Sequence, residues 1–226
     1  MTNANEPLKA IKPSDYQPAL PLNRLILKES PGEEAVAMDV LFVGGGPAGL
    51  AGAIELARLV RREKEQGGEL GELEIGVLEK AGSLGEHCLS GAVVNPRAFR
   101  ELFPNVPEQE LPLRRPAPKD RVYLLTEKGK ARIPTPPSMH NKGNHVASVC
   151  EIVRWMGGRA EELGVNVFTG FPAESLLVQD DRVIGIRTTP VGLDREGKPG
   201  SGHVPPTDVT ARVNVLAEGT RGALTQ

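Results

Sequence analysis

The chain has 226 residues and a formal net charge of −2, so its overall charge does not favour nucleic acid, and we expect none to bind. Hydrophobic residues make up 39%, enough for a folded core, while 26 glycines and 20 prolines predict many turns and long loops. The longest uncharged stretch, residues 40–54, is shorter than the roughly 20 residues of a membrane-spanning helix, so we expect no span.

The first 37 residues predict an extended N-terminal arm, because they are rich in proline and polar side chains and show no hydrophobic period. Glu6 and Asp15 lie in this segment, and no apolar signal core accompanies them. We therefore expect neither secretion nor organellar import.

Two cysteines, Cys88 and Cys150, are the only ones in the sequence. They lack C-x-x-C spacing, which excludes a zinc or iron–sulfur site built from this chain alone. We expect two reduced thiols in a cytosolic compartment.

A strand, a helix and a second strand open the predicted domain. Residues 38–43 form an apolar run typical of a strand buried on both faces of a parallel sheet. From Leu50, apolar residues recur on one helical face, and arginines and lysines gather toward the end of this helix. Glycines at 67–71 interrupt the helix, and residues 73–78 return to a strand that ends on Glu79.

The rest of the chain alternates between irregular and regular segments. Residues 80–147 hold most of the prolines, with a short strand at 122–125, and residues 149–163 predict a second amphipathic helix that ends at Gly164. We expect further strands at 165–168, 175–178, 182–188 and 209–217, a hairpin turn at 179–181 and a polar loop at 192–206.

The turn after the first strand satisfies G-x-G-x-x-G, with Pro47 and Ala48 between its last two glycines. Gly44 permits a tight exit from the strand, Gly46 lets the backbone approach a pyrophosphate, and Gly49 allows close packing of helix on sheet. The helix N-terminus supplies free N–H groups and a positive dipole. Between an apolar strand and an amphipathic helix, this turn predicts a dinucleotide site.

Glu79 is the predicted partner of the adenosine ribose hydroxyls. It follows Gly49 by 30 residues, more than the usual spacing of about 20, and the polar stretch 61–72 explains the difference as a longer helix end and loop. The alternative is a solvated carboxylate at a strand end. The motif does not choose between FAD and NAD, but a later strand ending in Glu218-Gly219 favours a flavin.

Four segments resemble the N-terminal part of the electron-transfer flavoprotein:ubiquinone oxidoreductase family. They are VGGGPAGLAGAIELARL (43–59), VLEKAGSLGEHCLSGAVVNPRAFRELFP (77–104), NKGNHVASVCEIVRWMGGRAEELGVNVFTGF (141–171) and VLAEGTRGALTQ (215–226). The resemblance covers about residues 38–226. It implies an α/β fold, a truncated Rossmann-like FAD-binding domain of the glutathione-reductase type with an interleaved β-rich quinone region and a Pro-rich insertion at about 90–147.

The resemblance also implies the residues of the site. The adenosine and pyrophosphate half of FAD would be held by residues of the glycine turn and second strand, Gly44, Gly46, Pro47, Ala48, Gly49, Glu79 and Lys80. Ser90, Gly91 and Ala92 would lie near the isoalloxazine, and Glu218 and Gly219 would close the site. We expect no catalytic side chain and no metal ligand, because the protein's part is to position the cofactor.

By this resemblance, electrons would pass from reduced electron-transfer flavoprotein through a 4Fe-4S cluster and FAD to ubiquinone. The family's cluster cysteines have no counterpart in this chain. We expect peripheral attachment to the cytoplasmic face of a bacterial-type inner membrane, with Phe103, Val106 and Leu111, within the Pro-rich region 102–118, as candidate lipid contacts.

Three other functions stay open. One is a related FAD-dependent monooxygenase or geranylgeranyl reductase, which shares the glycine turn and the strand-end acid. Another is a non-catalytic nucleotide-binding remnant, and the third is a dehydrogenase that uses NAD alone. The LSGAVVNP segment (89–96) favours the flavoprotein family over the first of these. A bound flavin, and whether NADH reduces it, would distinguish the NAD-dependent dehydrogenase.

Overall fold

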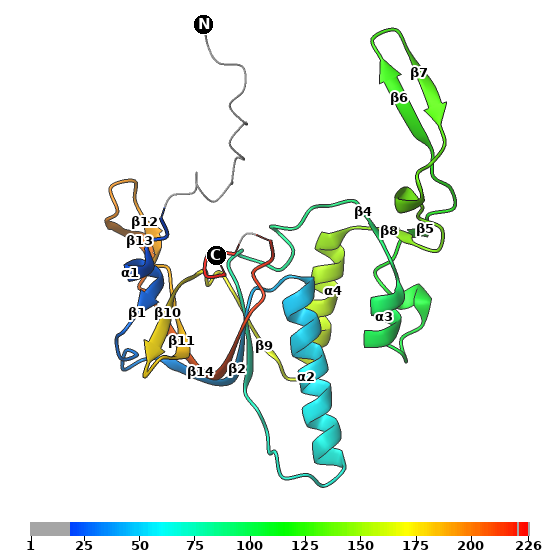
Figure 1. Ribbon diagram of the computed structural model, residues 1–226. Coiled ribbons are helices and arrows are strands. Elements are labelled where there is room, and N and C mark those ends of the chain that lie inside the picture. The colour runs from blue at the N-terminus through cyan, green and yellow to red at the C-terminus, as the bar shows by residue number, and fades with distance from the viewer. Residues whose placement is uncertain (1–18, 221, 226) are drawn as a thin grey trace, which may run out of the picture.

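The computed structural model describes residues 19–220 and 222–225, so residues 1–18 of the predicted arm lie outside the described part. A seven-stranded sheet in the order β1-β10-β11-β14-β2-β3-β9 forms its centre (Figure 1). The strands of this sheet are β1 (Ile26–Leu27), β2 (Val36–Val43), β3 (Ile75–Glu79), β9 (Asn166–Thr169), β10 (Ala173–Gln179), β11 (Arg182–Thr188) and β14 (Asp208–Leu216).

Four neighbouring strands, β9, β3, β2 and β14, run parallel. At the end of β2, Val43 is in register with Leu78 of β3 on one side and with Leu216 of β14 on the other. β2, which comes first along the chain, therefore lies between β3, which comes second, and β14, which comes last. In open α/β sheets, ligands bind at the carboxyl ends of the strands where the strand order reverses in this way.

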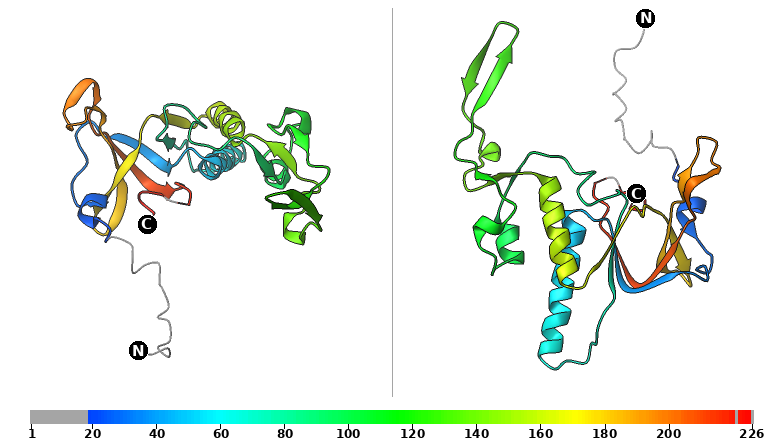
Figure 2. Two further views of the ribbon diagram at one scale, coloured as in Figure 1. Left: turned by 90° about the horizontal axis from the view of Figure 1, so that it is seen from above. Right: turned by 180° about the vertical axis from the view of Figure 1, so that it is seen from behind.

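Two helices, α2 (Pro47–Glu65) and α4 (Val149–Glu162), lie side by side on one face of the sheet (Figure 2). Both were predicted from their hydrophobic period, and both are confirmed. The end of α4 is also as predicted, because Gly164 has a φ of +84° and its N–H donates to the carbonyl of Glu161.

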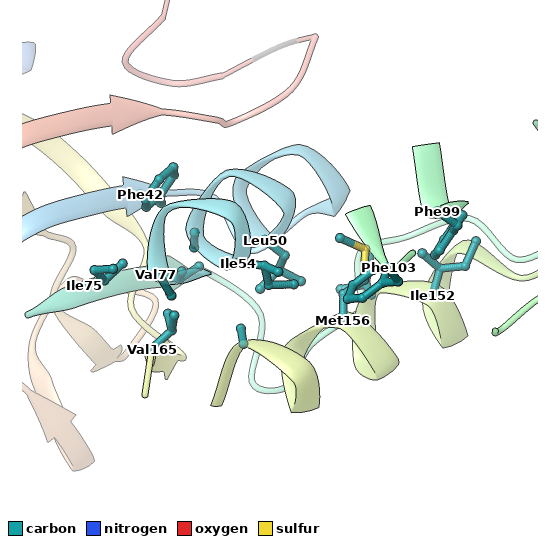
Figure 3. Packing of buried hydrophobic residues seen from close by; sticks show 14 of the residues in the cluster. Phe42, Leu50, Ile54, Ile75, Val77, Phe99, Phe103, Ile152, Met156 and Val165 are labelled. Atoms are coloured by element: carbon teal, nitrogen blue, oxygen red, sulfur yellow. The ribbon is translucent and has the colours of Figure 1, made fainter. Parts of the chain in front are cut away.

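Apolar side chains form one cluster on each face of the sheet. Under the helices, Leu50 and Ile54 of α2 pack in the same cluster as Val77 of β3, and all three are fully buried (Figure 3). On the other face, Leu41 and Ile186 are fully buried. The prediction of a first strand buried on both faces is confirmed.

Residues 92–147 form a group of small elements beyond α4 (Figure 1). They are β4 (Ala92–Val94), α3 (Arg97–Leu102), the 3-10 turn η2 (Glu108–Glu110), β5 (Arg115–Pro116), β6 (Val122–Thr126), β7 (Gly129–Ile133), the 3-10 turn η3 (Pro137–Met139) and β8 (His145–Ala147). β4, β8 and β5 pair as a small antiparallel sheet. β6 and β7 pair as a hairpin that projects away from the body.

The expectation that Phe103, Val106 and Leu111 reach lipid is wrong for Phe103 and Leu111. Their exposed fractions are 3% and 5%. The ring of Phe103 meets that of Trp155 edge-on, with 4.6 Å between the centroids, so the end of α3 is docked on α4. These apolar side chains therefore pack inside the protein. The hydrophobic pattern of the sequence does not distinguish a buried side chain from one that contacts lipid.

The chain after α4 is mostly β-structure. The hairpin turn predicted at 179–181 is confirmed, since Asp180 and Asp181 have φ values of +50° and +57° between the paired strands β10 and β11. The prediction of a plain loop at 192–206 is wrong, because β12 (Val191–Leu193) pairs with β13 (Pro199–Val204).

Residues 19–35 are tied to this β-structure. A short helix, α1 (Leu22–Leu25), leads into β1, which pairs in parallel with β10. The buried Asp208 carboxylate accepts the Gly32 N–H at 2.9 Å and two Arg187 N–H groups at 2.8 and 3.0 Å. Arg187 also donates to Glu29 at 2.8 Å. The boundary drawn at residue 37 stays a prediction.

Candidate dinucleotide site

The glycine turn connects β2 to α2 at the carboxyl edge of the parallel strands. Gly44 has a φ of +120°, and its N–H donates to the carbonyl of Leu78 at 2.9 Å. A Cβ placed on Gly44 would lie 2.4 Å from the carbonyl oxygen of Ala217. Both the backbone angle and the contact therefore require glycine at the exit from the strand.

Gly49 brings the first turn of α2 onto this exit. A Cβ there would lie 2.0 Å from the carbonyl oxygen of Gly44 and 3.3 Å from the Cβ of Ala217. The close approach of helix to strand that the motif predicts is therefore present in the structure. Ala217, directly after β14, packs against both Gly44 and Gly49. The glycine motif alone does not predict this contact.

Gly46 differs from its two neighbours. It is the N-cap of α2 with a φ of −78°, and within the described chain nothing lies within 4 Å of a Cβ built on it. Pro47 follows at the first helical position, and no side chain of the described residues caps this end. The helix N-terminus therefore faces open space, with the N–H groups of Ala48 and Gly49 in its first turn, which fits an anionic phosphate group.

Glu79 lies beside the turn, at the end of β3. Its side chain is only 13% exposed, and its two carboxylate oxygens accept the N–H of Gly45 at 3.2 Å and that of Ala81 at 2.9 Å. The Nδ1 atom of His87 lies 4.0 Å from the same carboxylate. The lone pairs that remain on Glu79 fit ribose hydroxyl donors. The sequence analysis did not predict the N–H groups that hold this carboxylate, although one of them belongs to Gly45 in the glycine turn.

Glu218 and Gly219 follow β14. They come directly after Ala217, which contacts the glycine turn. The Glu218 carboxylate accepts the N–H groups of Ala223 at 3.1 Å and Leu224 at 2.9 Å, so it stabilises the turn after β14. Gly219 has a φ of +84°. The structure thus places this pair next to Gly44, with the acid engaged by its own backbone.

Ser90, Gly91 and Ala92 lie on the α4 side of the molecule. The hydroxyl of Ser90 is 3.3 Å from that of Ser148, the N-cap of α4, and Gly91 has a φ of +85°. Ser148 is 6% exposed, and sequence reasoning missed it because a serine before a helix is an ordinary cap. Lys80 is exposed and lies one residue after Glu79.

A pocket of about 580 Å³ lies between α2, α3 and α4. Its apolar wall includes Pro47 at the start of α2, Val94 of β4 and Val149 of α4. Of the predicted site residues, Pro47 lines this pocket.

Among the described residues 19–220 and 222–225, no group of three or more histidine, cysteine, aspartate or glutamate side chains is arranged to hold a metal ion. None of the described helices is long and apolar enough to cross a membrane.

No family model matches the chain, but curated proteins do. It is 40% identical over 198 residues to the mitochondrial electron transfer flavoprotein-ubiquinone oxidoreductase of Oryza sativa subsp. japonica and 39% identical over 200 residues to that of Dictyostelium discoideum. It is also 40% identical over 196 residues to a protein of Acinetobacter baylyi named as a probable electron transfer flavoprotein-ubiquinone oxidoreductase.

These alignments cover 87%, 88% and 84% of this chain and 33%, 32% and 34% of the relatives, so the chain spans about a third of their length. The predicted resemblance to an N-terminal portion is confirmed. The names do not support the expected cytoplasmic face of a bacterial membrane, because most of these relatives are mitochondrial.

Solved structures show the same fold at low identity. A geranylgeranyl bacteriochlorophyll reductase-like protein from Thermoplasma acidophilum matches with a TM-score of 0.53 at 18% identity, over 82% of this chain and 40% of that one. A flavin-dependent monooxygenase in complex with FAD and substrate matches with a TM-score of 0.51 at 17% identity, over 84% and 31%. The predicted Rossmann-like α/β fold of FAD-dependent oxidoreductases is confirmed.

Proposed function

We propose that this relative of electron transfer flavoprotein-ubiquinone oxidoreductases forms the part of such an enzyme that holds the adenosine and pyrophosphate of FAD. One observation carries the proposal: the open N-terminus of α2 and the Glu79 carboxylate stand side by side at the carboxyl edge of the parallel strands. An anion and a neighbouring pair of hydroxyl donors are the ligand chemistry that such an arrangement binds.

Each residue group has its own task in this proposal. Gly46 leaves room for the pyrophosphate, and the N–H groups of Ala48 and Gly49 donate to it. Glu79 accepts hydrogen bonds from the ribose, and Ser90 with Gly91 and Ala92 approaches the flavin ring from the α4 side. FAD supplies one- and two-electron transfer when bound, and the protein positions it and excludes water.

The partners follow from the relatives' names. We propose that electrons arrive from electron-transfer flavoprotein and leave to ubiquinone, as those names state for the relatives. The 4Fe-4S cluster implied by the family would be held outside this chain, which contains only two cysteines.

A membrane contact is proposed for the β6–β7 hairpin rather than for residues 102–118. Leu124 and Leu125 are 58% and 74% exposed although they are large and apolar. Lys130 lies over the ring of Tyr123, 5.5 Å from its centroid, on the same hairpin. Exposed leucines beside an amphipathic aromatic and a cation are typical of a segment that dips into a lipid interface.

The first test is the visible absorption spectrum of the purified chain, with its flavin-to-protein ratio, before and after adding FAD. We expect a near-stoichiometric flavin spectrum that NADH alone neither produces nor bleaches. A folded chain that retains no flavin would favour the non-catalytic remnant. Flavin bleached directly by a nicotinamide would favour the monooxygenase or reductase class.

The hairpin is tested by flotation with vesicles of neutral and anionic phospholipid. We expect Leu125→Asp to reduce the bound fraction severalfold, because a carboxylate at that position opposes burial in lipid. Leu193→Asp is the matched control, since Leu193 is 42% exposed on the other hairpin, β12–β13. Equal binding of all three proteins would contradict the proposal.

A further inference from the structure

The only two cysteines of the sequence lie against each other, although 62 residues separate them. The Sγ of Cys150, in the first turn of α4, donates to the carbonyl oxygen of Cys88 at 3.0 Å. Both are free thiols, and both residues are partly exposed. A small oxidant can therefore reach the pair.

The segment that carries Cys88 crosses α4 at close range over several residues. A Cβ on Gly85 would lie 2.6 Å from the carbonyl oxygen of Cys150 and 3.1 Å from its Cα. One turn further along α4, the Nε of Arg154 donates to the carbonyl of Leu84 at 3.2 Å. The chain just before Cys88 is thus held against α4 at Cys150 and one turn beyond it.

Standard bond lengths and angles, together with the 3.0 Å contact between the Cys150 Sγ and the Cys88 carbonyl oxygen, put the two cysteine Cα atoms at most about 8 Å apart. Disulfides join Cα atoms up to about 7 Å apart. At that upper bound the Cα atoms must approach by roughly 1 Å, so the bond requires a rotation of the two side chains and a shift of the partly exposed segment 86–90.

We propose that Cys88 and Cys150 form a peroxide-sensitive dithiol site whose intramolecular disulfide ties the segment 80–92 to α4. This segment begins next to Glu79 and ends with Ser90, Gly91 and Ala92. If the proposed function holds, both ends of the segment contact FAD, and the disulfide slows the exchange of the cofactor.

Hydrogen peroxide is the oxidant in this proposal, and it accepts the two electrons that the thiols lose. Burial raises the pKa of the Cys88 thiol above its ordinary value, and Cys150 and Glu79 raise it further, which disfavours a Cys88 thiolate. We therefore assign the first attack to Cys150: its sulfur bonds to one peroxide oxygen, the O–O bond breaks, and the other oxygen leaves as water with the thiol proton of Cys150.

The sulfur of Cys88 then attacks the sulfenic sulfur of Cys150. The S–S bond forms, the S–O bond breaks, and the oxygen leaves as water with the thiol proton of Cys88. The two sulfurs together lose two electrons, which reduce one peroxide to two waters.

The test treats the full chain with hydrogen peroxide and compares its intact mass and its thiol labelling with those of the untreated chain. We expect a loss of two hydrogens, no thiol left to label, and one cross-linked peptide pair containing Cys88 and Cys150. Dithiothreitol should reverse all three. Persistence of both thiols, or covalent dimers in place of the internal bond, would overturn the proposal.

Two single variants assign the steps. Cys88→Ser should stop at a sulfenic acid on Cys150 that dimedone traps, whereas Cys150→Ser should leave Cys88 labelled after the same treatment. Sulfenic acid on Cys88 in the second variant, with none on Cys150 in the first, would contradict the assigned order.

The tie to α4 is measured without cofactor, by hydrogen exchange of the amides in residues 80–92. We expect exchange slower by roughly tenfold or more in the oxidised chain, because the bond removes local opening. Unchanged exchange would contradict the tie. FAD release is measured separately, so a chain that binds no FAD would refute the proposed function while the mass and exchange data still decide the disulfide.

Discussion

Gly46 and Gly49 stand three positions apart in one turn, yet a methyl group added to each meets different surroundings. At Gly46 it points into open space, and the φ of −78° suits alanine. We expect Gly46→Ala to leave the free energy of unfolding almost unchanged but to weaken FAD binding by about tenfold or more, since the methyl takes the space of the pyrophosphate. Urea unfolding and flavin titration measure the two effects.

Gly49→Ala is the matched comparison. Its methyl would lie 2.0 Å from the carbonyl oxygen of Gly44, so the helix must move off the strand. We expect the free energy of unfolding to fall by about 1–3 kcal/mol. Equal loss of stability in both variants would show that Gly46 also serves packing.

Glu79→Gln tests the ribose contact. Glutamine keeps an oxygen that accepts the N–H of Gly45 or Ala81 but loses the charge that strengthens a hydrogen bond from a hydroxyl. We expect FAD affinity to fall by about tenfold, with the elements of secondary structure intact by circular dichroism. Unchanged affinity would assign Glu79 to support of the turn alone.

Among the secondary-structure elements, the segment before β2 is held to the sheet by one buried carboxylate, that of Asp208. The Arg187 guanidinium, with the Gly32 N–H, holds the pKa of the Asp208 carboxyl below its usual range, although burial opposes this. A lowered folded-state pKa means that the stabilisation is complete above the unfolded pKa of about 3.9 and is lost as the pH falls through the lower folded value.

Asp208→Asn should therefore lower the free energy of unfolding by about 2–4 kcal/mol at pH 7, because Arg187 loses its buried charged partner and keeps only the exposed Glu29. The difference from the unmodified chain should shrink as the pH falls below about 4. Urea unfolding across that range measures it. Asp181→Asn removes the same charge from an exposed turn and should change stability little.

Elements with a strong hydrophobic period or a marked turn could be predicted from the sequence, as α2, α4 and the turn at Asp180-Asp181 show. The β12–β13 hairpin could not, because Gly192–Pro206 is mostly polar and shows no alternation of apolar residues that would mark two strands. At the site, glycine spacing located the turn. The contribution of Ala217 depends on a strand pairing over a long separation, which no local pattern encodes.

The whole molecule should gain stability from the cofactor, since the site joins β2, β3 and β14. FAD at about 100 times its dissociation constant should raise the free energy of unfolding by about 2.7 kcal/mol. Urea midpoints with and without FAD measure this. Gly46→Ala at the same FAD concentration should show a smaller gain, and an equal gain would place the cofactor elsewhere.

The parallel pairing of β2 with β14 also has a consequence during synthesis on the ribosome. Val43 and Leu216 are partners in this pair, so one edge of β2 has no neighbour until residues 208–216 have left the exit tunnel. The nascent chain therefore carries one uncovered edge of an apolar strand while residues 44–207 are being made, and we expect it to rely on chaperones during that time.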